Sequence, residues 1–142
     1  MQKVFIIEDD AEMAECIALA VRQIKDTEVE IFSNVIAAIN AFSADVPQLI
    51  FLDILLDGPD GFTLLNELNS YTDTVEIPII IASSLALPKR DLLAYNVAQV
   101  LDKETMTPRQ IIDAVQDALN LKQILTESTS PEPEWGNIDA CQ

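Results

Sequence analysis

Five short, mostly apolar runs separated by longer amphipathic stretches constrain the fold of this chain more than any other feature. The runs are rich in β-branched and aromatic residues, which favour β-strands. The stretches between them carry apolar residues at helical spacing, as at Met13, Ile17 and Ala20. Buried strands that alternate with helices are typical of a parallel sheet covered on both faces. The predicted strands are residues 4–7, 29–32, 49–52, 79–81 and 97–101.

The pattern predicts an α/β fold: a five-stranded, doubly wound parallel sheet of the flavodoxin-like kind, with helices on both faces. Right-handed crossovers leave few other topologies. A chain of 142 residues has room for one such domain. The predicted helices are residues 13–24, a helix capped by Ser33 or Asn34 that ends at Phe42, residues 62–68, a short helix opened by Pro88 around Leu92 and Leu93, and a last helix that begins near Pro108.

The composition changes at Thr126. Residues 126–142 contain two prolines and four acidic residues but no basic one. Such a segment lacks the apolar surface that folding requires. We therefore expect a folded domain over residues 1–125 and a disordered acidic tail over residues 126–142, in which Trp135 is the one residue suited to anchor on a partner.

Charge and residue usage exclude several classes of function. The chain has 24 acidic and 8 basic residues, a formal net charge of −16, and no histidine. So negative a surface repels nucleic-acid phosphates and anionic membranes. The absence of histidine excludes a serine–histidine hydrolase triad, a histidine-ligated zinc and a phosphohistidine on this chain.

The two cysteines match no metal-binding or redox spacing. Cys16 lies in an apolar helical stretch, so we expect it in the core, and Cys141 is expected as a free thiol in the tail. No signal peptide is visible, because acidic residues interrupt the apolar run after Ile7. No segment approaches the roughly 18 apolar residues of a membrane span. A cytoplasmic location without membrane insertion is predicted.

Polar residues that carry chemistry follow four of the predicted strands. The carboxyl ends of parallel strands share one edge of a sheet, where ligands bind. The carboxylates would therefore converge, and each contact of like charges at 4 Å costs about 4 kcal/mol at an effective dielectric constant of about 20. Such a cluster needs a cation, and oxygen ligands alone indicate Mg²⁺, or Mn²⁺ in its place. The residues are Glu8, Asp9 and Asp10, then Asp53, then Ser83 and Ser84, then Lys103.

Each of these residues alone has a simpler interpretation. Asp9 or Asp10 suits a helix cap, with Glu12 close behind. A lone Asp53 could be a loop residue, a serine pair after a strand is usually part of a turn, and a lone Lys103 is usually a surface lysine. Their joint placement at strand ends favours a common site.

Residues 1 to about 122 resemble the receiver domain of bacterial two-component response regulators, the chemotaxis type. The resemblance rests on the first strand with its three acids, on Asp53 after an apolar strand, and on Asp60–Gly61 beyond it. It also rests on residues 78–84 and on Lys103 after Leu101 and Asp102. The roles that it implies are phosphoacceptor for Asp53, metal ligands for Glu8, Asp9, Asp53 and the carbonyl of Leu55, switch hydroxyl for Ser83, and pocket lysine for Lys103.

The resemblance implies a stand-alone switch rather than an enzyme, with only self-phosphorylation and self-dephosphorylation chemistry. The phosphoryl donor would be a histidine kinase or a histidine phosphotransfer protein. The signal would pass to a downstream protein, and a homodimer could form through the face of the fourth helix, fifth strand and last helix. The donor would dock beside the first helix, whose expected exposed residues include Glu12, Glu15, Arg22 and Gln23.

Several positions depart from the family pattern. Glu104 stands where a proline usually follows the lysine, and Val100 where an aromatic residue often reports activation. Leu55 and Asp57 change the loop after Asp53, which affects the lifetime of the phosphoryl group. The span between Ser83 and Lys103 is about two residues short, which implies a trimmed fourth helix.

Two other classes of function stay open. One is a receiver that takes no phosphoryl group and acts as a binding module. The other is an enzyme on a similar sheet. An aspartate-nucleophile phosphatase needs a second aspartate two residues after the first, where Leu55 stands. A flavin protein needs a hydroxyl- and glycine-rich loop after the first strand, where three acids stand.

Overall fold

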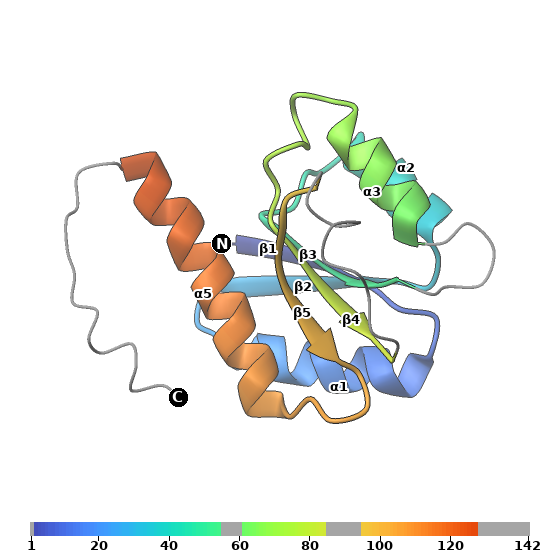
Figure 1. The fold of residues 1–142 in the computed structure, drawn as a ribbon, viewed down its shortest axis with the longest axis vertical. Coiled ribbons are helices and arrows are strands. Elements are labelled where there is room, and N and C mark those ends of the chain that lie inside the picture. The colour runs from blue at the N-terminus through green and yellow to red at the C-terminus, as the bar shows by residue number, and fades with distance from the viewer. Residues whose placement is uncertain (1, 55–60, 85–94, 128–142) are drawn as a thin grey trace.

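A parallel sheet of five strands forms the middle layer of the molecule (Figure 1). The order of its strands is β2-β1-β3-β4-β5. The order reverses direction beside β1, which confirms the predicted doubly wound, flavodoxin-like α/β fold. The structure is a computed structural model that describes residues 2–54, 61–84 and 95–127, except the side chains of residues 61, 62 and 121–127. The strands are β1 (Gln2–Ile7), β2 (Thr27–Phe32), β3 (Leu49–Asp53), β4 (Ile79–Ser83) and β5 (Val97–Asp102).

The interior strands are apolar because both of their faces are covered. Every residue of β3 and β4 is buried, as are the last four residues of β1. Edge strands β2 and β5 are more polar and more exposed. β2 begins at Thr27, two residues before the predicted start, and exposes Glu28 and Glu30. One side of this strand faces solvent, so its charged residues need no partner in the core.

Helices cover both faces of the sheet (Figure 1). Successive residues of a strand point to opposite faces, so the two sides of β1 enter different cores. Val4 and Ile6 pack in the core beneath α1 (Ala11–Arg22) and α5 (Pro108–Glu127). Phe5 and Ile7 pack in the core beneath α2 (Val35–Phe42) and α3 (Gly61–Asn69).

The helix boundaries follow local capping chemistry. Asn34, one of the two predicted caps of α2, accepts a hydrogen bond from the N–H of Ala37 at 2.8 Å. α1 ends at Arg22, two residues before the predicted end, and Ile24 still packs against the core from beyond the helix. The apolar periodicity therefore extended past the helix itself.

The prediction that Cys16 lies in the core is wrong. Cys16 is an exposed free cysteine on α1. The buried stripe of this helix runs through Ala14, Ile17 and Val21. Position 16 lies about 100° around the helix from Ile17 and about 140° from Val21, at the margin of the buried face next to Ala20, so its side chain reaches solvent.

Several predictions lie outside the described residues. These are the fourth helix opened by Pro88, the roles of Trp135 and Cys141, and the nature of the tail. The last described helix, α5, ends at Glu127. Among the helices in the described part of the chain, none is both long enough and apolar enough to cross a membrane.

Candidate functional site

The candidate site lies at the carboxyl edge of the sheet. Glu8 and Asp9 follow β1, Asp53 is the last residue of β3, and Ser83 is the last residue of β4. The strand register aligns these ends, since Ile7 pairs with Leu52 and Asp53 pairs with Ala82. Residues far apart in the sequence therefore share one rim because the strands are parallel and in register.

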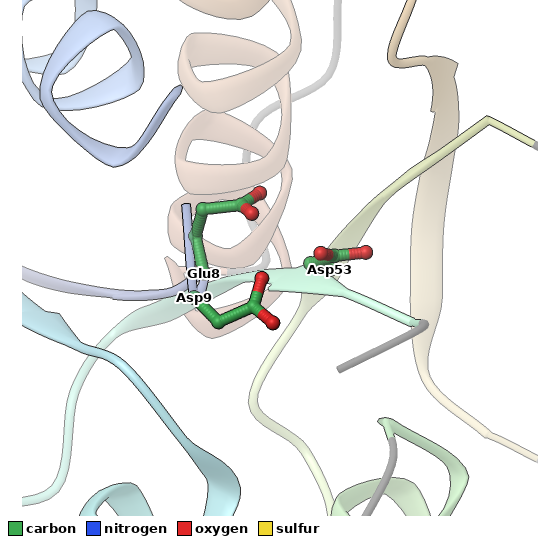
Figure 2. A group of neighbouring side chains, drawn as sticks. All are labelled: Glu8, Asp9 and Asp53. Atoms are coloured by element: carbon green, nitrogen blue, oxygen red, sulfur yellow. The ribbon is translucent and has the colours of Figure 1, made fainter. Parts of the chain in front are cut away.

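Glu8, Asp9 and Asp53 form one acidic cluster (Figure 2). Each contributes a carboxylate oxygen, and the three oxygens lie within 4.8 Å of one another. Only 2% of Glu8 and 4% of Asp53 is exposed to solvent, whereas Asp9 is exposed. Two carboxylates of the cluster are therefore shielded from solvent, and the third, that of Asp9, leaves one side of the cluster open to solvent and to a small ligand.

Lys103 contacts the two buried members of the cluster. Its Nζ lies 2.9 Å from Asp53 Oδ2 and 3.1 Å from each carboxylate oxygen of Glu8. Burial alone would lower the pKa of Lys103, but hydrogen bonds to Asp53 and Glu8 outweigh it and raise the pKa above its ordinary value. The lysine is therefore a fixed positive charge within the site.

One ammonium does not fully compensate the carboxylates. Burial raises the pKa of Glu8 from 4.5 to about 7, and the charge of Asp53 adds to this rise. Hydrogen bonds from the N–H of Asp10 and from Lys103 act in the opposite direction. Without a further cation, Glu8 is therefore close to its point of protonation at neutral pH.

The arrangement fits a divalent metal ion. Glu8 Oε1 is buried and accepts no hydrogen bond within the described part of the chain, although Lys103 is near. The ammonium of Lys103 lies 3.1 Å from this oxygen but is shared with Asp53, so a further cation or a water molecule would complete the surroundings of the buried oxygen. Three carboxylates with no nitrogen or sulfur ligand match the preference of Mg²⁺ and Mn²⁺. Leu55, predicted as a further ligand through its carbonyl, lies outside the described residues.

Asp10 has a different task from its two neighbours. Its Oδ1 accepts hydrogen bonds from the N–H groups of Glu12 at 3.0 Å and Met13 at 3.3 Å, which caps α1. Its own N–H donates to Glu8 Oε2 at 3.1 Å. The capping interpretation of the acidic run is therefore correct for Asp10, whose backbone N–H also holds Glu8.

Ser83 is buried, with 3% exposed, and is tied to the lysine through the backbone. Its carbonyl oxygen accepts the N–H of Lys103 at 2.9 Å. Asp102, to which the sequence assigned no role, accepts a hydrogen bond from the N–H of Glu104 at 2.9 Å through Oδ1. An aspartate often forms a turn by accepting a hydrogen bond from the backbone N–H two residues later. The residue type alone therefore predicts a turn here, but it does not predict that the turn positions a residue of the site.

The sequence matches the family model of the response regulator receiver domain over residues 4–116. The chain belongs to this family. The resemblance drawn from the strand ends is thereby confirmed, as is the connection of this receiver domain with two-component signalling. A search of curated proteins gave no significant match.

Solved structures similar to this receiver domain come from several signalling proteins. The N-terminal domain of a response regulator/sensory box/GGDEF three-domain protein from Carboxydothermus hydrogenoformans shares 25% identity, with a TM-score of 0.75 over 88% of this chain and 99% of that one. The signal receiver domain of a signal transduction histidine kinase from Syntrophus aciditrophicus shares 24% identity, with a TM-score of 0.74 over 84% of this chain and 91% of that one. The Mn²⁺-bound form of response regulator Rcp1 shares 19% identity, with a TM-score of 0.65 over 94% of this chain and 100% of that one.

Proposed function

We propose that this receiver domain is a phosphorylation switch in which Asp53 accepts a phosphoryl group in a Mg²⁺-dependent reaction. The observation that supports it best is the buried carboxylate of Asp53, which lies within 4.8 Å of the acidic pair and 2.9 Å from Lys103. Phosphoryl transfer depends mainly on positioning and on stabilising charge, and this site offers both.

In the proposed step, an oxygen of Asp53 forms a bond to phosphorus while the bond from phosphorus to the donor breaks. With a phosphohistidine donor, the leaving group is the imidazole nitrogen of the donor protein, and the product is an acyl phosphate on Asp53. Lys103 already contacts Asp53, so its ammonium is placed to pair with a phosphoryl oxygen as that group arrives.

Glu8, Asp9 and Asp53 are the residues that would hold the metal ion, with the carbonyl of Leu55 as a further predicted ligand. When bound, a divalent ion supplies positive charge that offsets the carboxylates and the phosphoryl oxygens. Rcp1, a response regulator of similar fold, has been solved in a Mn²⁺-bound form, which supports the proposal that this chain also binds a divalent ion. We favour Mg²⁺, and Mn²⁺ is the expected substitute.

The output of the switch is a change of surface rather than a reaction. Phosphoryl oxygens on Asp53 would recruit the hydroxyl of Ser83 and the ammonium of Lys103. Since Val100 is a valine with 42% exposed, no ring reorients at this position of β5. The downstream partner, and any homodimer, would use the face of the fourth helix, β5 and α5.

The donor is proposed to be a histidine kinase or a histidine phosphotransfer protein. The predicted contact residues are exposed; they are Glu12, Glu15 and Arg22 on α1 and Gln23, which follows the helix. Arg22 lies 3.3 Å from Glu15, a surface ion pair that a partner could rearrange at small cost.

Intact-mass measurement after incubation with acetyl phosphate and Mg²⁺ tests the proposal. We expect one added phosphoryl group on the wild-type protein and none on Asp53→Asn or after removal of Mg²⁺ with EDTA. Equal labelling of wild type and Asp53→Asn would refute Asp53 as acceptor. A wild-type protein that neither labels nor binds beryllofluoride with Mg²⁺ would instead be a binding module, and turnover of simple phosphoesters would indicate a phosphatase.

A further inference from the structure

The backbone of Lys103 is held on both sides. On one side, its N–H donates to the carbonyl oxygen of Ser83 at 2.9 Å. On the other, the side chain of Asp102 accepts the N–H of Glu104 at 2.9 Å. A carboxylate bonded to the amide two residues later closes an Asx turn, which restricts the backbone of the residue between them. That residue is Lys103.

The chain beyond the turn is anchored independently. The carbonyl oxygen of Asp102 accepts the N–H groups of Thr105 at 3.2 Å and Met106 at 2.9 Å, and Met106 packs against the core under α1 and α5. The start of α5 is closed by a reciprocal pair, in which Thr107 N–H donates to Gln110 Oε1 at 2.9 Å and Gln110 N–H donates to Thr107 Oγ1 at 3.1 Å. Since the segment has these separate anchors, the carboxylate of Asp102 acts locally, on the backbone around Lys103.

We propose that Asp102 is a positioning residue whose side chain holds the turn that aims Lys103 at Asp53 and Glu8. Asp102 is exposed and contributes no oxygen to the acidic cluster, so it does not act by touching the reacting atoms. The ammonium group of a lysine is attached to the backbone by a flexible four-carbon chain. A mobile backbone at Lys103 would therefore let the ammonium move away from its partners. Loosening the turn should therefore free Lys103 from its two carboxylates. The importance of this for phosphoryl transfer rests on the proposed function, but the positioning itself does not.

Chemical labelling of Lys103 tests the positioning directly in the full chain. Reductive methylation with formaldehyde and a borane reductant, followed by peptide mass spectrometry, gives the rate at Lys103 relative to exposed Lys25. We expect Asp102→Ala to raise that relative rate about 3- to 10-fold, the effect of losing one hydrogen bond. Asp102→Asn should keep the wild-type rate, because its amide oxygen can close the same turn.

Thr107→Ala is the matched control. It removes a capping hydrogen bond from the same segment and lowers stability by a similar mechanism, but it leaves the turn at Lys103 intact. Its Lys103 should methylate at the wild-type rate. An unchanged rate in Asp102→Ala, an Asp102→Asn variant that behaves like Asp102→Ala, or an equal rise in Thr107→Ala would each overturn the proposal.

Phosphorylation kinetics give the second readout. With acetyl phosphate and Mg²⁺, Asp102→Ala should slow labelling about 3- to 10-fold in the wild-type background and add nothing in a Lys103→Met background. An equal slowing in both backgrounds would show that Asp102 acts through another route, and would overturn the proposal. If the wild-type protein takes no phosphoryl group, the proposed function fails while the methylation experiment still decides the role of Asp102.

Discussion

Two lysines of this receiver domain each lie among several carboxylates, yet their surroundings differ sharply. Lys103 contacts Glu8 and Asp53, whose side chains are 1% and 4% exposed. Lys3 contacts Glu28, Glu30 and Asp45, whose side chains are about half exposed, at 53%, 48% and 48%. The lysines themselves are equally covered, at 17% and 18% exposed.

The difference therefore lies in the acids rather than in the lysines. Around Lys3, water solvates each carboxylate, so the ion pairs contribute little. Around Lys103, the carboxylates have lost their water, and the ammonium and a metal ion must replace it. The cluster around Lys103 can bind a cation because the strand ends bury its carboxylates. The cluster around Lys3 contains the same residue types, but it lies on the edge of the sheet and is a network of surface ion pairs.

The largest expected difference between the clusters is in phosphoryl transfer. Lys103→Met should lower the rate of labelling by acetyl phosphate by about 10²-fold or more, because it removes a fixed positive charge from the transition state. Lys3→Met should label at the wild-type rate. A time course of intact mass for the two variants makes the comparison, and a similar loss in both would contradict the distinction.

The next effect concerns metal binding. Because a ligand that binds only the folded state stabilises it, Mg²⁺ at 100 times its Kd should raise the free energy of unfolding by about 2.7 kcal/mol. Asp9→Asn should lose most of this increase, since Asp9 belongs to the acidic cluster. The matched variant Glu28→Gln should keep it. Urea unfolding with and without MgCl₂ measures the increase, and a wild-type protein that Mg²⁺ leaves unchanged would speak against the metal site.

An effect of similar size is expected in the dependence of stability on pH. The pKa of Glu8 rises from 4.5 to about 7 on folding, so the folded state binds more protons than the unfolded state between these values. In the metal-free protein, stability should therefore be highest at the acid end of this window and fall as pH rises through it, by up to about 1.4 kcal/mol per pH unit.

Glu8→Gln should remove this contribution, and Glu28→Gln should retain it. Urea unfolding in EDTA at several pH values between 5 and 8 would detect the difference. The free energy of unfolding changes by roughly 1.4 kcal/mol per pH unit for each proton that the folded and unfolded states bind differently. A slope that is the same in wild type and Glu8→Gln would show that Glu8 is ionised throughout this range.

The smallest effect is expected from salt at the Lys3 cluster. Lys3→Met should leave the thermal midpoint of unfolding nearly unchanged, and added NaCl should reduce whatever difference remains, since exposed ion pairs are screened. Differential scanning calorimetry at low and high NaCl measures this. A large, salt-insensitive loss of stability would show that the two clusters are more alike than their exposure indicates.

Much of the fold could be predicted because it depends on short-range patterns. The apolar runs gave all five strands, and Asp53 and Ser83 were placed at strand ends as the structure has them. The prediction that Cys16 is buried was wrong because it relied on the hydrophobic character of the surrounding stretch. Burial of a residue in a helix depends more on its angular position around the helix axis. The early start of β2 at Thr27 was missed because an edge strand tolerates charged residues.

The sequence by itself determined which residue types follow each strand, and a parallel sheet then brings those positions to one edge. The sequence left open whether Asp9 or Asp10 caps α1, and only the tertiary structure assigned that cap to Asp10. The tertiary structure also decided that Lys103 reaches both Glu8, 95 positions away, and Asp53, 50 positions away. The physical reason is that strand order and register set these long-range contacts. The contacts exclude water from the carboxylates of Glu8 and Asp53, and carboxylates without water are stable together only beside a cation.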